Sequence, residues 1–285
     1  MAQSTGDIKR RIRSVSSTKQ ITKAMELVSS AKLRKAREKL ERTRPYYQTI
    51  VRSIQEILSG TTGIRHPFLM KREVKNKAYI VLTGDRGLAG GYNSNAIKLA
   101  ESQITDKENT TIIAVGQKGR DHFRRRGYKI AGEYLHIAED PQFLDAQSIG
   151  NLVVELYKKG EVDEVNIVYT SFKSVISQEP KVLKLLPAEG IDEGKEKKKT
   201  TLIEYEPSPE EVLDYLIPKY VQSAIYGALI ESSASEQGAR RTAMESATDN
   251  AEEMIDDLKL LYNRARQASI TQEISEIVGG AEALK

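Results

Sequence analysis

The sequence predicts an α/β fold in which a long antiparallel coiled coil of the N- and C-terminal helices flanks a central, Rossmann-like α/β domain. Three observations predict it. Apolar residues recur at helical spacing through both chain ends, the two ends carry opposite net charge, and the middle alternates short apolar runs with helical segments. The predicted division is a first helix at 1–58, a central domain at 59–208 and a last helix at 209–285.

The first segment is strongly basic, with 14 Lys and Arg against 5 Asp and Glu in residues 1–58. Its apolar residues follow one another in steps that alternate mostly between three and four, which predicts one helix from residue 5 to residue 58 with a narrow apolar seam. Pro45 is the one helix breaker in this stretch. We therefore expect a kink or a local break near Arg44.

The last segment is acidic, with 7 Lys and Arg against 14 Asp and Glu in residues 209–285. No proline follows Pro218, and many seam positions are Ala, which lets helix backbones approach closely. The opposite charges of the two ends predict that their helices pair antiparallel. The seam is expected to include Ile21, Met25 and Val28 on the first helix, and Met254, Leu258, Leu261, Ile274 and Ile277 on the last.

The middle of the chain reads as alternating strands and helices, which is typical of a small, mostly parallel sheet covered by helices. The segment 187–200 is rich in charge and Gly, and we expect it to form an exposed loop or a partly disordered linker. Strands are predicted at 77–83, 111–116, 128–134 and 165–170, and helices at 93–105, 117–126 and 143–159.

Several classes of function are disfavoured by composition. The chain has no Cys, which excludes disulfides and thiolate chemistry, and its three scattered His residues lack metal-ligand spacing. No apolar run reaches the roughly 20 residues that a membrane helix needs. The carboxylates sit at spacings typical of helix-surface pairs. The sequence therefore indicates no catalytic, metal or cofactor site.

The turn TGDRGLAGGYNSN follows a strand and precedes a helix, where a phosphate could meet free backbone amides. Its glycines are spaced GxxGxxG, however, and no GK[ST] follows, so neither nucleotide fingerprint is present. A tight turn that packs against a neighbour is the preferred interpretation. The alternative, a nucleotide-binding enzyme, needs a phosphate cradle that this turn does not supply.

The stretch SAKLRKAREKLERTR is basic enough to raise the alternative of a DNA-binding or architectural coiled-coil protein. Glu38 and Glu41 interrupt the basic run, and the acidic last helix offers it a partner within the chain. A solvated face, or one that contacts acidic protein loops, is therefore preferred. Nucleic acid is not expected as a partner.

Four long segments carry a family resemblance: TKQITKAMELVSSAKLRKA at 18–36, TGDRGLAGGYN at 83–93, ASEQGARRTAMESATDNA at 234–251 and YNRARQASITQEISEIVGGA at 262–281. In order and spacing they resemble the γ subunit family of bacterial F-type ATP synthases. The resemblance covers both ends and the middle, whereas 127–200 diverges.

The resemblance implies a non-catalytic rotor shaft, present in one copy per complex. In that family the two terminal helices turn inside a hexamer of α and β subunits, and the α/β domain lies beside the ε subunit and the membrane c-ring. Proton flow turns the ring and the shaft, whose asymmetric faces drive the active sites of the partner subunits through different affinities. The implied location is the cytoplasmic face of the bacterial cell membrane, as a peripheral subunit without cofactors.

The matched motifs also imply contact residues. Those in the bearing region of the hexamer are Lys23, Met25, Arg240, Gln267, Thr271 and Glu276. Those in the foot, near the c-ring or ε, are Arg44, Tyr46, Tyr205 and Glu206.

Overall fold

The computed structural model describes residues 5–60, 66–70, 72–188 and 205–282. The chain separates into two compact units, Met1–Val28 with Arg241–Lys285, and Ser29–Arg240. Helix α1 (Thr5–Gly60) and helix α5 (Pro209–Glu282) each contribute residues to both units.

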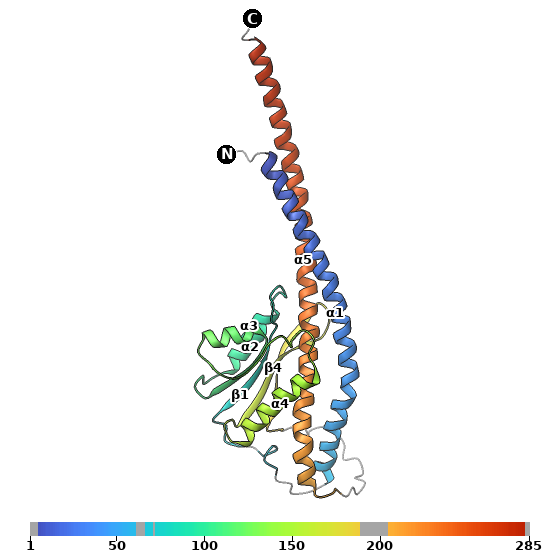
Figure 1. The fold of residues 1–285 in the computed structure, drawn as a ribbon, viewed down its shortest axis with the longest axis vertical. Helices are drawn as coiled ribbons and strands as arrows, with labels where there is room; N and C mark the ends of the chain where they lie inside the picture. The colour runs from blue at the N-terminus through green and yellow to red at the C-terminus, as the bar shows by residue number, and fades with distance from the viewer. Residues whose placement is uncertain (1–4, 61–65, 71, 189–204, 283–285) are drawn as a thin grey trace. The chain divides into compact units, whose positions relative to one another are not determined.

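The larger unit is built on a five-stranded sheet in the order β3-β2-β1-β4-β5 (Figure 1). Four strands are parallel, with Ile80 opposite both Ile113 and Ile167, and only the β4–β5 pair is antiparallel. β1 and β2 are buried except at Lys77, as expected for a parallel sheet covered on both faces. The strands are β1 (Lys77–Leu82), β2 (Thr110–Val115), β3 (Lys129–Tyr134), β4 (Glu164–Phe172) and β5 (Gln178–Leu186).

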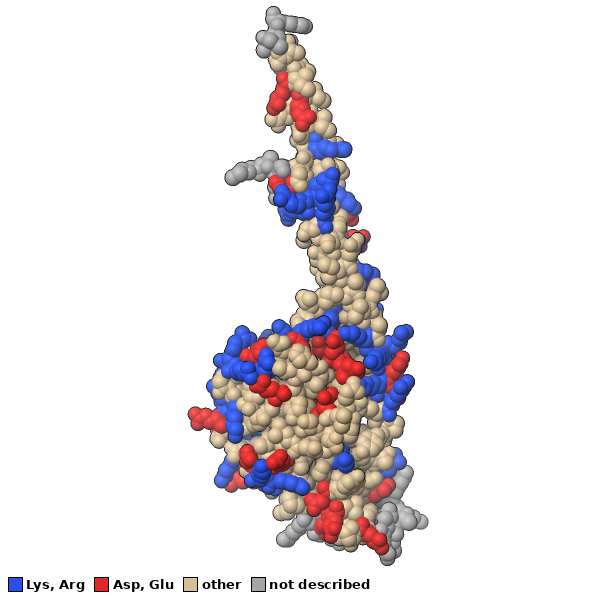
Figure 2. All heavy atoms as spheres, viewed as in Figure 1, with Lys and Arg blue, Asp and Glu red and all other residues tan. Residues whose placement is uncertain are grey.

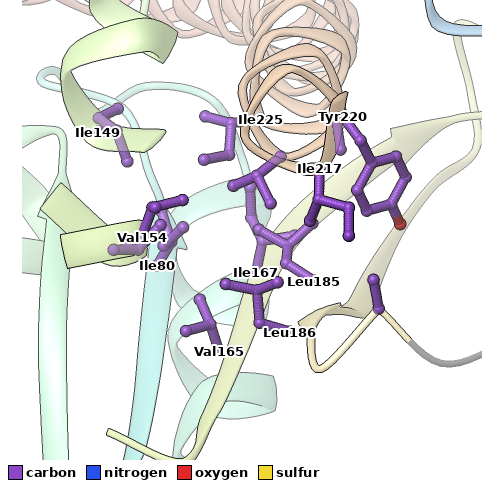
Figure 3. Packing of buried hydrophobic residues seen from close by; sticks show 14 of the residues in the cluster. Ile80, Ile149, Val154, Val165, Ile167, Leu185, Leu186, Ile217, Tyr220 and Ile225 are labelled. Carbon is purple, nitrogen blue, oxygen red and sulfur yellow. The ribbon is translucent and has the colours of Figure 1, made fainter. Parts of the chain in front are cut away.

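Alternate residues of each strand point to opposite faces, so the sheet supports two apolar clusters. Tyr79 and Val81 face α2 (Tyr92–Gln103) and α3 (Gln117–Arg125). On the other face, Ile80 belongs to a larger cluster, shown in part in Figure 3. That cluster joins the sheet to α4 (Phe143–Lys158), to residues 213–229 of α5 and to residues 50–57 of α1.

The predicted mostly parallel sheet and the predicted order of its first four strands and three covering helices are confirmed. The expected break near Arg44 is wrong, because α1 continues through Pro45. Pro45 supplies no amide proton to the Glu41 carbonyl oxygen, so the helix passes through it with one backbone hydrogen bond fewer. Residues 189–200 of the predicted loop lie outside the described residues.

The smaller unit is an antiparallel pair of helical segments, residues 5–28 of α1 and 241–282 of α5. The Thr248 hydroxyl lies 2.8 Å from the Thr22 hydroxyl, and Lys19 Nζ lies 2.9 Å from Glu252 Oε1. Partner numbers rise on one helix as they fall on the other, which fixes the antiparallel direction. The buried residues of this pair are Ile8, Thr22, Glu26, Met244, Thr248, Ala251, Ile255 and Leu258.

Candidate functional site

Around residues 21–28 of α1, several side chains on the solvent-exposed outer face are apolar, whereas the side chains that face α5 are polar. Ile21 and Val28 are 58% and 53% exposed, whereas Thr22 and Glu26 are each 8% exposed against α5. The expected seam through Ile21 and Val28 is therefore wrong. The Thr22 hydroxyl donates to the Lys19 carbonyl oxygen and faces the Thr248 hydroxyl, so hydrogen bonds satisfy the polar seam. The apolar side chains are left for a different neighbour.

Lys23 and Met25 stand on the same stretch of α1. Lys23 is exposed, and its Nζ lies 3.1 Å from Glu26 Oε2, which ties the lysine to its own helix. Met25 is half-buried. The structure thus places both predicted residues at the edge of the apolar outer face, one charged and one flexible and apolar.

The end of α5 carries a row of exposed apolar side chains. Every residue from 266 to 281 is exposed. Ile270, Ile274 and Ile277 recur at helical spacing on one side, with exposures of 47–70%, and Val278 adjoins them. The expectation that Ile274 and Ile277 pack in the seam is wrong, as it is for the exposed Met254 and Leu261. On the face that Figure 2 shows, this end carries few charges.

Three predicted contact residues lie on this end of α5, and all are exposed: Gln267, Thr271 and Glu276. The Thr271 hydroxyl donates to the Gln267 carbonyl oxygen at 2.9 Å, and Glu276 Oε1 accepts from Gln272 at 2.9 Å. These hydrogen bonds stay within the helix. The side chains of Gln267 and Thr271 are therefore available to a partner that encloses the helix.

Arg240 is placed differently from the other predicted contact residues, because it is buried in the larger unit with 7% exposure. Its Nη2 lies 2.5 Å from Glu236 Oε1 and donates to the Gly87 carbonyl oxygen at 3.3 Å. Burial raises the pKa of Glu236, and the Arg240 guanidinium opposes that shift. Arg240 thus fastens the loop after β1 to α5.

The loop after β1 packs tightly against its neighbours, as predicted for the Gly-rich turn. A Cβ on Gly84 would lie 2.8 Å from the Glu236 carboxyl group, so only glycine fits there without a shift. The Gly84 amide donates to Asn93 Oδ1 at 2.7 Å, and Asp85 accepts the Gln117 amide at the start of α3. The Gly84 amide and the start of α3 are therefore occupied by the protein's own side chains.

The predicted foot residues lie in the larger unit. Arg44 and Tyr46 are exposed on α1 and line one shared pocket, which is described below. Tyr205 is half-buried against the main apolar cluster, and burial raises its pKa, helped by the nearby Glu56 carboxylate. Glu206 is exposed. Arg44 and Tyr46 thus line the same pocket, whereas Tyr205 does not line it and packs against the main apolar cluster.

The basic stretch of α1 meets acidic residues that the sequence reasoning did not single out. Lys32 pairs with Glu139, and Lys35 and Lys39 pair with Asp140, both on the loop between β3 and α4. The hydrogen bond from Lys32 lowers the pKa of Glu139. Figure 2 shows basic and acidic side chains close together on this unit. These three lysines therefore contact an acidic protein loop rather than the acidic last helix.

Comparison with known proteins decides the family. A family model described as ATP synthase matches residues 4–284. The ATP synthase gamma chain of Alkaliphilus metalliredigens is 63% identical over 283 residues, which make up 98% of each chain. The chain belongs to the ATP synthase gamma chain family.

Other gamma chains and solved structures agree with this membership. The gamma chain of Acetobacterium woodii, named as sodium ion specific, is 57% identical over the full length of both chains. A chain of the Euglena gracilis mitochondrial ATP synthase gives a TM-score of 0.70 at 21% identity and covers 98% of this chain and 94% of its own. At that identity the likeness shows the fold alone. Among the described residues, no helix is long and apolar enough to cross a membrane, and no three acidic or His side chains are grouped to hold a metal ion.

Proposed function

We propose that this gamma chain is the central rotor shaft of an F-type ATP synthase, which transmits torque between an ion-driven c-ring and a catalytic hexamer of α and β subunits. The observation that carries the proposal is the uncovered apolar row Ile270, Ile274 and Ile277 at the end of α5. Such a row is costly in water, so it indicates a surface that a partner encloses. Family membership says which assembly contains that partner.

The hexamer bearing, in this proposal, consists of the end of α5 and the apolar outer face of α1. Met25, Gln267 and Thr271 are apolar or uncharged, whereas Lys23 and Glu276 already interact within their own helices. A surface of this kind can change neighbours during rotation without breaking strong intermolecular ion pairs. Arg240 contributes indirectly, because it fastens the loop at Gly87 to α5.

The foot, in this proposal, is the α/β domain at 59–208, and the shaft comprises 1–58 and 209–285. Arg44, Tyr46, Tyr205 and Glu206 contact the ε subunit or the c-ring. The chain is a peripheral subunit on the cytoplasmic face of the membrane. Family membership and the exposure of Arg44, Tyr46 and Glu206 support this assignment.

The chain itself performs no chemistry in this role. Each orientation of an asymmetric shaft contacts the three catalytic subunits differently, and therefore stabilises a different conformation of each. Torque becomes a difference in nucleotide affinity, which is a coupling free energy between sites on separate subunits. The coupling ion is a property of the ring. The name of the gamma chain that is 63% identical to this one mentions no ion. The gamma chain that is 57% identical is named as sodium ion specific.

Reconstitution tests the proposal. The purified chain is mixed with α and β subunits of the Alkaliphilus metalliredigens enzyme, whose own gamma chain is 63% identical to this one. We expect a complex of three α, three β and one copy of this chain, with MgATP hydrolysis above that of α and β alone. Failure to form a complex, or hydrolysis equal to that of α and β alone, would refute the proposal.

Paired variants test the surface that carries the proposal. Ile274→Asp with Ile277→Asp places two charges on the apolar row, and assembly should weaken at least tenfold. Ser275→Asp places a charge about 100° from Ile274 and 200° from Ile277 around the helix, and should assemble normally. Because all three positions are exposed, the isolated chain should fold in either case. Equal assembly by both variants would exclude the row as a bearing surface.

A further inference from the structure

The larger unit contains a cavity whose aromatic interior has no part in the proposed rotor role, although Arg44 and Tyr46 on its lining are also proposed contacts of the foot. Its volume is about 580 Å³, within the range of small-molecule sites, and it is partly open to solvent. The wall is formed by α1, by β4 and β5, by the start of α4 and by α5. The lining includes Tyr46, Tyr47, Phe143, Tyr169, Phe172 and Tyr226.

Contacts with one another and with basic side chains hold three of the aromatic side chains of the lining in place. The rings of Phe143 and Tyr226 meet edge to face, with centroids 5.5 Å apart, and Lys39 Nζ lies 5.9 Å from the Tyr226 ring centroid. The Arg37 guanidinium lies 6.0 Å from the Phe172 ring centroid. These interactions fix aromatic side chains before any ligand arrives, which lowers the ordering cost of binding.

The polar groups at the cavity indicate which ligand chemistry fits. Ser223 is 5% exposed, and its hydroxyl oxygen has almost no accessible surface, so it offers no contact to a molecule in the cavity. Glu231 is engaged, because its Oε1 accepts from the Ser171 hydroxyl at 2.7 Å and the Phe172 amide at 3.0 Å. Arg42 and Arg44 are exposed on the lining, and neither is paired with a described carboxylate. The lining carries one more positive charge than negative.

We propose that this cavity binds a planar aromatic molecule of two or three rings that carries one acidic group. The aromatic walls offer faces and edges for ring stacking, and the exposed Arg42 and Arg44 bind the anion. A void of about 150 Å³ accommodates one benzene ring, so this larger and partly open cavity has room for several rings. An acyl-chain anion would fill the volume without using the ring faces, and is the chemistry that the test must exclude.

Gly227 supplies the decisive variant. It lines the cavity on α5, and a Cβ built there would meet no atom within 4 Å. Gly227→Phe therefore places a ring in the open space without a clash at its Cβ, whereas Gly227→Ala leaves the volume nearly unchanged and serves as the matched control. Arg42→Gln with Arg44→Gln removes the anion contacts at exposed positions, so this second variant should fold even if the first does not.

The test titrates the full chain with 8-anilinonaphthalene-1-sulfonate, followed by calorimetry and by the fluorescence of the probe. We expect one saturable site, retained in Gly227→Ala, weakened at least tenfold in Gly227→Phe and at least tenfold in the double arginine variant. Octane-1-sulfonate, which has the charge without the rings, should bind at least tenfold more weakly.

Three results would overturn the proposal. The first is the absence of saturable binding up to about 1 mM probe, which corresponds to less than about 4 kcal/mol of affinity. The second is equal binding by the parent, the filled variant and the arginine variant, which would place the probe elsewhere, for example on the apolar row of α5. The third is equal affinity for octane-1-sulfonate, which would assign the site to acyl chains.

Discussion

Replacing Arg240 by Met should destabilise the chain strongly and in a pH-dependent way. The substitution keeps an unbranched side chain of similar length but leaves the buried Glu236 without its 2.5 Å ion pair and frees the Gly87 carbonyl oxygen. Both side chains of the pair are less than 10% exposed. Removing one partner of a buried pair costs about 3–5 kcal/mol, and we expect about 4 kcal/mol at pH 8.

The pH dependence follows from the direction of the Glu236 pKa. Burial raises that pKa in the folded chain, and Arg240 opposes the rise, so the variant raises it further. An acid whose folded pKa lies above its unfolded value binds a proton more readily when folded. The stability that the buried carboxyl group contributes is therefore fully present below its unfolded pKa. It is lost as pH rises from the unfolded pKa to the folded pKa, by up to about 1.4 kcal/mol per pH unit. The variant should thus lose less stability at pH 5 than at pH 8.

The assay is urea denaturation followed by far-ultraviolet circular dichroism at pH 5 and pH 8. Glu236→Gln should cost less than Arg240→Met, because the arginine keeps its hydrogen bond to Gly87. The double variant Arg240→Met with Glu236→Gln should also be more stable than Arg240→Met alone, since it buries no unpaired charge. An equal loss at both pH values, or a double variant that loses the sum of the single losses, would refute the reasoning.

Three further predictions concern single residues. Met25→Lys should leave the melting temperature of the chain unchanged but lower the number of ions pumped per ATP hydrolysed in reconstituted vesicles, because it puts a charge on a moving contact. Unchanged pumping would contradict the assignment of Met25 to the bearing. Gly116→Ala should destabilise by about 3 kcal/mol in urea, because its φ is +85° and the new Cβ would lie 2.1 Å from the Thr83 carbonyl oxygen; a loss below about 1 kcal/mol would show that the backbone there adapts. Gly227→Ala should stabilise by about 0.5–1 kcal/mol in the same assay, because its Cβ enters open space in a helix; a loss of stability would mean that the space is filled.

The sequence was sufficient to predict elements whose burial is uniform. β1, β2 and the start of β4 are almost continuously buried and rich in apolar or β-branched residues, and their predicted bounds match the structure within two residues. β5 was missed because Gln178–Leu186 is half-buried and carries Glu179, Pro180, Lys181 and Lys184, which hide its alternation. As an antiparallel edge strand it needs only one apolar face, so its signal is weak.

The helix seams show the limit of periodicity as a guide to a functional surface. Apolar spacing indicates that a helix face meets something, but it does not say whether the neighbour is the same chain or another one. Ile21 and Val28 point outward because Thr22 and Thr248 satisfy each other inside the pair. The polar seam could be recognised only with the partner helix in view, and the same holds for the burial of Arg240 beside Glu236.

The contact between Thr22 and Thr248 joins residues 226 positions apart, which has a consequence for biosynthesis. A ribosome that adds about 5–20 residues per second needs roughly 10–45 s to make the stretch between them. During that interval the first helical segment has no α5 to pair with, and it lacks the packing that supplies most of the stability of a helix in a protein. Its Lys and Arg residues, which outnumber its acidic ones, keep the waiting segment solvated and repel other nascent copies. The basic character of α1 thus protects the chain before its partner helix exists.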